Sequence, residues 1–203
     1  MGSSNKRIMI IARLSDGRLI MHNPIALDEP SMAKIDAWGE VSAILIPNRF
    51  HRRDAFIMHA RYPNAKVYAP SGAVAQASKA TPCSGTYAEV PTDATVLLRD
   101  IEGIGRREGV VIVRSDDGIS AVFCDTLLNL PKLYGPMGML LHPTGTLAVP
   151  RPTRWLFTHD IAALRRDLSS IASIEGLVRV IPGHGSVVAS DTAQRLQVAA
   201  ERL

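Results

Sequence analysis

The sequence is poor in cysteine and lacks long apolar runs. Cys83 and Cys124 are the two cysteines in 203 residues, so a disulfide framework and a cysteine-based zinc cluster are both excluded. The longest uncharged stretch, 133–150, is interrupted by prolines and glycines. A membrane-spanning helix needs about 20 consecutive apolar residues. We therefore expect no membrane insertion and no membrane partner.

Runs of like charge are also absent. The formal charge is +4, but no five like charges are consecutive and no basic stripe with interleaved aromatics occurs, so we expect no nucleic-acid partner. Met1 to Lys6 are polar, and the apolar run Ile8 to Ala12 is too short for the core of a secretory leader. Cytoplasmic residence is therefore the expectation. At 203 residues, the chain suits one domain over 1–203.

In each half of the chain, strands come first and then alternate with helices. Asp16-Gly17 predicts a hairpin turn between strands at 7–13 and 18–22. The further predicted strands are 41–46, 65–69, 95–99, 109–114, 119–124 and 178–181. Helices are predicted at 28–39, at 51–63, weakly from Ser71 to Ser78, at 160–174, and from Ser190 or Asp191 to the end. The first of these has an apolar face of Met32, Ile35 and Trp38. This order favours two packed mixed sheets with helices outside.

A long segment, 130–158, has four glycine or proline clusters and little periodicity. Such a length is typical of a lid or an interface loop. Its apolar residues Met137, Met139, Leu140 and Leu141 fit a substrate lid and an interface between copies of the chain equally well. A homo-oligomer is thus one of two expectations for this segment.

Two predicted strands end at polar side chains that suit a metal site. The strand at 178–181 runs into Pro182-Gly183, and His184 follows; the strand at 119–124 runs into Asp125. Sites in α/β proteins usually lie at the carboxyl ends of strands. We therefore expect Asp125 and His184 to lie together as half of a metal site.

These motifs resemble those of the metallo-β-lactamase superfamily. Cys124-Asp125-Thr126-Leu127 is similar to the family's Gly-Asp-Thr-Leu strand end, which supplies a bridging aspartate, and Pro182 to Gly185 matches its Pro-Gly-His-Gly turn. The resemblance covers most of the chain. It implies an α/β fold, a four-layer αβ/βα sandwich of two mixed β-sheets with helices outside, and the activity of a metal-dependent hydrolase.

The family's His-x-His-x-Asp-His signature is degenerate here, since 47–54 reads Pro-Asn-Arg-Phe-His-Arg-Arg-Asp. If His51 takes the place of the last histidine, Asn48 and Phe50 replace the middle histidine and the aspartate. If Pro47 matches the residue before the signature, Arg52 and Arg53 replace the aspartate and a histidine. A further family histidine is expected within 101–109, where Glu108 is the candidate substitute. The pattern resembles a subgroup with Pro-Asn-x-x-His as first motif and His-x-Pro, here His22-Asn23-Pro24, after the opening hairpin.

Under the first alignment, the resemblance implies that His51, Asp125 and His184 bind one zinc or iron ion. A catalytic zinc has three protein ligands and an open position for water, whose pKa it lowers to about 7. Asp125 and His184 are then the catalytic residues. The alternative is that each of the three side chains hydrogen-bonds its own turn, as buried polar groups must.

Several arginines lie in the two segments that should flank the lost ligand positions: Arg49, Arg52, Arg53, Arg106 and Arg107. They repel a second dication, and planar guanidinium groups suit carboxylate or phosphate. We therefore expect a small acidic ligand at Arg52 and Arg53, with Asn48, Glu108 and His22 beside it. The alternative is a solvated basic face.

Two functional hypotheses follow. The first is a hydrolase with a reduced, single-metal site. The second is a non-catalytic descendant of the fold that binds an anionic ligand or a protein partner without metal.

Overall fold

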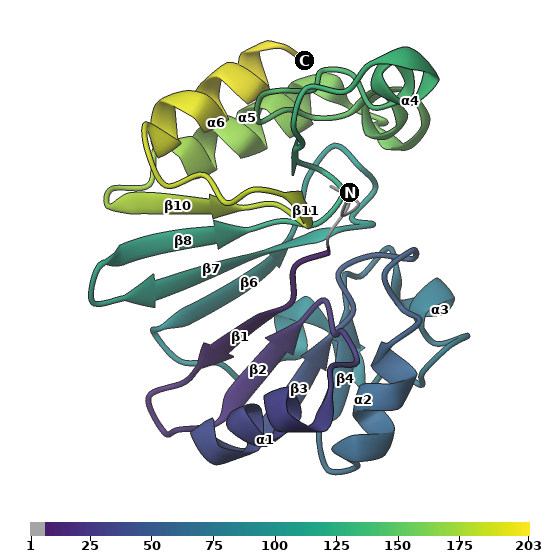
Figure 1. Cartoon of the computed structure of the whole chain (residues 1–203), viewed down its shortest axis with the longest axis vertical. Helices are drawn as coiled ribbons and strands as arrows, with labels where there is room; N and C mark the ends of the chain where they lie inside the picture. Colours follow the sequence, from purple (N-terminus) through teal and green to yellow (C-terminus); the bar gives the residue numbers. More distant parts are fainter. Residues whose placement is uncertain (1–6) are drawn as a thin grey trace.

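Two mixed β-sheets lie face to face, with helices on the outer side of each, in a computed structural model that describes residues 7–203 (Figure 1). The expectation about a leader at Met1 to Lys6 lies outside the described residues. Within 7–203, no helix is both long and apolar enough to cross a membrane.

The first sheet has the strand order β1-β2-β3-β4-β5. Its strands are β1 Ile10–Arg13, β2 Leu19–His22, β3 Val41–Leu45, β4 Lys66–Ala69 and β5 Gly85–Thr86. β1 and β2 form the predicted antiparallel hairpin, and the other neighbours are parallel. Helices α1 Glu29–Trp38, α2 Ala55–Arg61 and α3 Val74–Ala77 connect these strands. Parallel neighbours need such crossovers, because a tight turn cannot join them.

The second sheet has the order β10-β8-β7-β6. Its strands are β6 Val96–Asp100, β7 Gly109–Ser115, β8 Gly118–Val122 and β10 Leu177–Ile181. Helices α5 Ile161–Ala172 and α6 Thr192–Glu201 cover it (Figure 1). The smaller elements are the 3₁₀ turn η1 Tyr87–Glu89, β9 Leu128–Asn129, α4 Gly135–Leu140, the π-helix η2 Thr153–Phe157, and β11 His184–Gly185, which pairs with β9.

Alternating side chains divide the interior into three apolar layers. In β2, Leu19 and Met21 pack with α1 and α2 residues, whereas Ile20 packs between the sheets. In β8, Ala121 packs with α5 and α6 residues, and Val122 faces the first sheet. Because successive strand side chains point to opposite faces, each sheet is buried on both sides. The predicted four-layer α/β sandwich is confirmed.

Two helix predictions need correction. The helix expected from His51 begins at Ala55, because the Asn48 side chain accepts hydrogen bonds from the backbone N–H groups of Phe50 and His51 and holds them in a turn. Trp38, expected on the apolar face of α1, is exposed. The start of α1 is as predicted, since Asp28 caps it by accepting from Ser31 N at 3.0 Å.

Candidate metal centre and adjoining cavity

The strand ends of both sheets meet at one edge of the sandwich. β2 ends at His22, β3 leads to Asn48, β8 leads to Asp125 and β10 leads to His184. Glu108 joins them from the start of β7, because this strand runs antiparallel to β8. Residues far apart in the sequence therefore share one site.

Three side-chain donor atoms converge in this site. His51 Nε2 lies 3.2 Å from Asp125 Oδ1, His184 Nε2 lies 3.5 Å from the same oxygen, and the two imidazole nitrogens are 3.3 Å apart. These three nearly equal separations place the atoms at the corners of a triangle, with room for one shared cation or proton. The three residues form a group that could hold a metal ion.

Asn23 fixes the orientation of the His51 ring. The Asn23 amide nitrogen donates to the Ile8 carbonyl at 2.8 Å, so its Oδ1 is the acceptor that faces His51 Nδ1 at 2.9 Å. His51 Nδ1 therefore carries the proton in the neutral ring, and Nε2 directs a lone pair at the cluster. Asn23 has a φ of 55°, a left-handed conformation that asparagine tolerates better than most residues.

His184 is positioned by the turn that follows β10. A Cβ atom on Gly183 would lie 2.9 Å from Cys124 Cα, so only glycine allows this turn to approach the end of β8. Gly183 N donates to the Cys124 carbonyl at 3.1 Å, which ties His184 to the segment that carries Asp125. The His184 Nδ1 atom is buried and has no hydrogen-bond partner within the described residues.

The Asp125 carboxyl group is held in its ionised form. Burial raises its pKa, but the neighbouring His184 and His51 rings and the hydrogen bond from Asn48 outweigh burial and hold the pKa well below the usual range. Asp125 is thus a carboxylate at neutral pH.

Asn48 and Glu108 hold Asp125 in place through hydrogen bonds. Asn48 Nδ2 donates to Asp125 Oδ2 at 2.9 Å and to Glu108 Oε2 at 3.1 Å. Glu108 accepts the backbone N–H groups of the β8 turn, those of Cys124, Asp125 and Thr126, each at 2.9 Å. Burial and the neighbouring Asp125 raise the pKa of Glu108, and these donors oppose the rise. The Asn48 amide thus lies between two carboxylates and donates a hydrogen bond to each.

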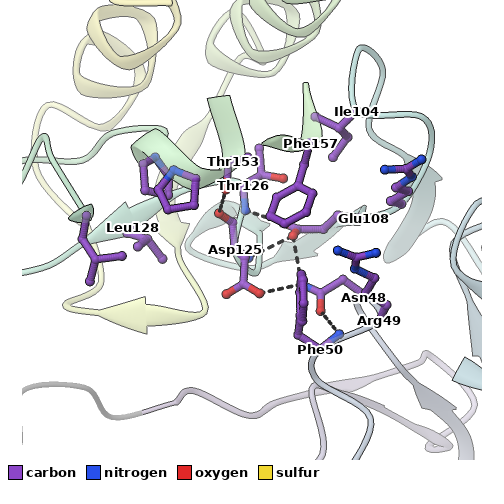
Figure 2. A pocket seen from close by; sticks show the side chains of 14 residues that line it. Asn48, Arg49, Phe50, Ile104, Glu108, Asp125, Thr126, Leu128, Thr153 and Phe157 are labelled. Carbon is purple, nitrogen blue, oxygen red and sulfur yellow. Dashed lines mark hydrogen bonds between the residues drawn. The ribbon is translucent and has the colours of Figure 1, made fainter. Parts of the chain in front are cut away.

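An apolar cavity of about 190 Å³ adjoins Asp125 (Figure 2). Its polar floor includes Asn48, Asp125 and Thr153, and Thr153 Oγ1 donates to the Asp125 carbonyl at 2.9 Å. The apolar walls are Phe50, Ile104, Leu128, Leu141, Pro150, Pro152 and Phe157.

Arg49 and Arg107 add positive charge to this cavity. The Arg49 guanidinium carbon lies 4.6 Å from the Phe50 ring centroid and 5.0 Å from that of Phe157. Within residues 7–203, neither arginine forms an ion pair. Both charges are therefore open to a ligand.

Solved structures of metallo-β-lactamases are similar to nearly the whole chain. The DIM-1 metallo-β-lactamase has a TM-score of 0.61 at 12% identity, over 96% of this chain and 86% of that chain. The metallo-β-lactamase FIM-1 from Pseudomonas aeruginosa in the mono-zinc form has a TM-score of 0.61 at 15% identity, over 98% of this chain and 88% of that chain. The metallo-β-lactamase from Pontibacter korlensis has a TM-score of 0.63 at 11% identity, over 98% of this chain and 89% of that chain. The protein has the metallo-β-lactamase fold. No protein-family model and no curated protein matches its sequence.

Within this metallo-β-lactamase fold, the structure brings together five residues that the sequence singles out. His51, Asp125 and His184 form the cluster, and Asn48 and Glu108 contact Asp125. Their roles in metal or substrate binding stay predictions.

The other predicted ligand-binding residues do not line the cavity. Arg52 donates to the Gln76 carbonyl, Arg53 is exposed, and neither lines the cavity. His22 is buried behind the cluster and does not line the cavity either.

Sequence reasoning missed several residues of the site. Asn23 was visible within the His-Asn-Pro motif, but only the fold shows that it contacts His51. Thr153 and Phe157 belong to the long segment without periodicity, so no sequence signal placed them at the site.

His22 should make stability depend on pH. Burial, and secondarily the nearby His51, lower its pKa from 6.5 to about 3, and neither ring nitrogen has a partner within the described residues. As pH falls from 6.5 to 5, His22 binds a proton in the unfolded chain but stays neutral in the folded protein. The free energy of unfolding therefore falls. In urea unfolding, the wild type should lose about 1.6 kcal/mol more over this interval than His22→Leu. Equal losses would contradict the buried, neutral state of His22.

Proposed function

We propose that the protein is a hydrolase with a single-metal site formed by His51, Asp125 and His184. Donors 2.0–2.1 Å from a tetrahedral zinc ion lie about 3.3–3.4 Å from one another. The separations of 3.2, 3.3 and 3.5 Å in the cluster fit this requirement without rearrangement. That agreement is the observation that carries the proposal. Two imidazoles and a carboxylate are ligands that suit zinc and iron.

The side chains around the cluster have separate tasks. When bound, a metal ion would act as a Lewis acid and lower the pKa of a coordinated water molecule. Asn23 keeps the proton of His51 on Nδ1, away from the cluster. Asn48 holds Asp125 Oδ2, which leaves Oδ1 directed at the two histidines. Glu108 is a positioning residue, because both of its oxygens accept hydrogen bonds.

Support for one metal rather than two comes from Asn48. Its amide donates to both Glu108 and Asp125, so the two carboxylates already have a shared partner. FIM-1, which has the same fold, has been solved in a mono-zinc form. One-metal occupancy is therefore compatible with this architecture.

The cavity favours a small acidic substrate. Its volume of about 190 Å³ lies below the roughly 300–1,000 Å³ of pockets for drug-sized ligands. Apolar walls suit a hydrocarbon body, and guanidinium groups suit carboxylate or phosphate. Arg49 and Arg107 line the cavity, whereas Arg52 and Arg53 do not. We therefore assign anion recognition to Arg49 and Arg107.

Metal content tests the hydrolase proposal. Protein purified without chelator should contain about one zinc or iron ion per chain by elemental analysis. Adding zinc to the chelator-treated protein at 100 times its Kd should stabilise it by about 2.7 kcal/mol, which for this chain length raises Tm by about 5–10 °C. A protein that holds no transition metal and does not respond to zinc would refute the proposal.

Anion binding is tested by the same melting assay. Phosphate or citrate should raise Tm, and Arg107→Ala should remove that rise. Arg53→Ala, at an exposed position outside the cavity, is the matched control and should keep it. If Arg52→Ala or Arg53→Ala abolishes the response and Arg107→Ala does not, the assignment drawn from the sequence is the better one.

One observation favours the second candidate function, anion binding without metal. Metal-ligating histidines almost always donate their other ring N–H to a protein group or to water. His184 Nδ1 has no partner within the described residues. If Nε2 bound a metal ion, the ring proton would lie on Nδ1 and remain unpaired. Without metal, the proton can lie on Nε2 and be donated to Asp125, so no ring proton is unpaired. Stabilisation by phosphate or citrate, together with no response to zinc, would identify this function.

A further inference from the structure

Six large apolar side chains, each more than half exposed, occupy one surface beside the cavity. They are Tyr134, Met137, Met139, Leu140, Trp155 and Leu156, in and around α4 and η2, and we call them the apolar face. The two segments are joined, because Arg151 donates to the Met139 carbonyl at 2.8 Å and lies 5.3 Å from the Trp155 ring centroid. Large exposed apolar patches with polar residues around them mark sites of interaction with proteins or membranes.

The segment that carries the apolar face has basic side chains and no acidic one. Residues 126–159 contain no aspartate or glutamate, and they carry Lys132, Arg151 and Arg154, the last of which donates to the carbonyls of Arg202 and Leu203. The Lys132 ammonium lies 5.5 Å from the Tyr134 ring centroid, so basic and aromatic side chains are paired at two points of the face. A partner of this face must therefore be both apolar and anionic.

We propose that the apolar face docks the protein on an anionic lipid surface. Aromatic residues concentrate at membrane–water interfaces, and basic residues near them are attracted to anionic headgroups. Peripheral docking needs no spanning helix, so it agrees with the lack of one in 7–203. It differs from the sequence-based expectation of no membrane partner, which considered insertion only.

A second copy of the chain fits this face less well. In a two-fold dimer the same patch meets itself. Lys132, Arg151 and Arg154 of both copies would then approach one another, and 126–159 supplies no carboxylate to separate them. A bilayer containing anionic lipid provides both the apolar interior and the opposite charge.

The site adjoins this face. Leu141, next to α4, and Phe157, in η2, line the cavity whose floor is Asp125. Docking through the apolar face would therefore bring the cavity close to the lipid surface. The inference itself depends on neither metal nor catalysis.

Tryptophan fluorescence tests the proposal directly, since Trp38 and Trp155 are the two tryptophans of the chain. In Trp38→Phe, the emission of Trp155 should shift to the blue on adding vesicles of phosphatidylcholine and phosphatidylglycerol. In Trp155→Phe, the emission of Trp38, which is exposed on α1, should not shift. Salt should weaken the Trp155 response, because it screens attraction to the headgroups.

Co-sedimentation with the same vesicles provides the second readout. Leu156→Ala should lower the partition coefficient about tenfold, as expected for loss of one large buried apolar side chain. Lys132→Glu should also weaken binding, whereas Lys34→Glu on α1 should not. The proposal is overturned if Trp155 responds to no vesicle, if neutral phosphatidylcholine vesicles bind equally well, or if the shift follows protein concentration with a dimer detected by light scattering.

Discussion

Replacing His51 or His184 with alanine should lower the affinity for zinc by at least about a hundredfold. Loss of a group that merely orients a ligand costs about 10–100-fold, and these variants remove the ligand itself. Each substitution leaves two donors of the three that lie 3.2–3.5 Å apart. Isothermal titration of chelator-treated protein with zinc measures the change.

The matched control is His159→Ala, which removes an exposed histidine outside the cluster and should leave zinc affinity unchanged. Asp125→Asn should behave like the histidine variants, because it exchanges the anionic donor for a neutral amide. If either cluster histidine can be removed without loss of affinity, the ligand set proposed above is wrong.

Glu108→Ala should lower the free energy of unfolding by about 3–5 kcal/mol. The Glu108 side chain is buried and accepts three backbone N–H groups and the Asn48 amide. Each buried donor left unpaired costs about 1–3 kcal/mol, partly relieved by entering water. Urea unfolding measures this loss, and zinc affinity should fall with it, because the turn that carries Asp125 loses its support.

Glu102→Ala controls for the loss of a carboxylate from the same loop. Glu102 is exposed, and its Oε1 lies 3.8 Å from Arg106 Nε, so its removal should change the free energy of unfolding by no more than about 0.5 kcal/mol. A loss below about 1 kcal/mol for Glu108→Ala would show that the N–H groups of Cys124, Asp125 and Thr126 find other partners.

The layered fold could be predicted because its signals are local. Alternating apolar residues give the strands, and side chains such as Ile20 and Met21 then face opposite layers. The ends of strands could also be predicted from the sequence, because Pro182-Gly183 ends β10 just before His184. Residues at strand ends gather at one edge in such a fold, which is why Asp125 and His184 could be paired from the sequence.

Side chains in loops could not be placed in this way. The Asn48 side chain holds Phe50 and His51 in a turn, and α2 begins only at Ala55. Arg52 donates to the Gln76 carbonyl and does not line the cavity. The sequence left two alignments of 47–54 open, and only the folded loop shows His51 Nε2 beside Asp125. The segment 130–158 has no periodicity, so its contribution of Phe157 to the cavity was not predictable.

The central claim is that three donors from two sheets share one metal ion, and a crystal soaked with zinc tests it most directly. Anomalous diffraction at the zinc edge should show one peak per chain, about 2.0–2.1 Å from His51 Nε2, Asp125 Oδ1 and His184 Nε2. A second peak between Asn48 and Glu108 would contradict the single-metal site. A map without a peak at the cluster would contradict the metal centre itself.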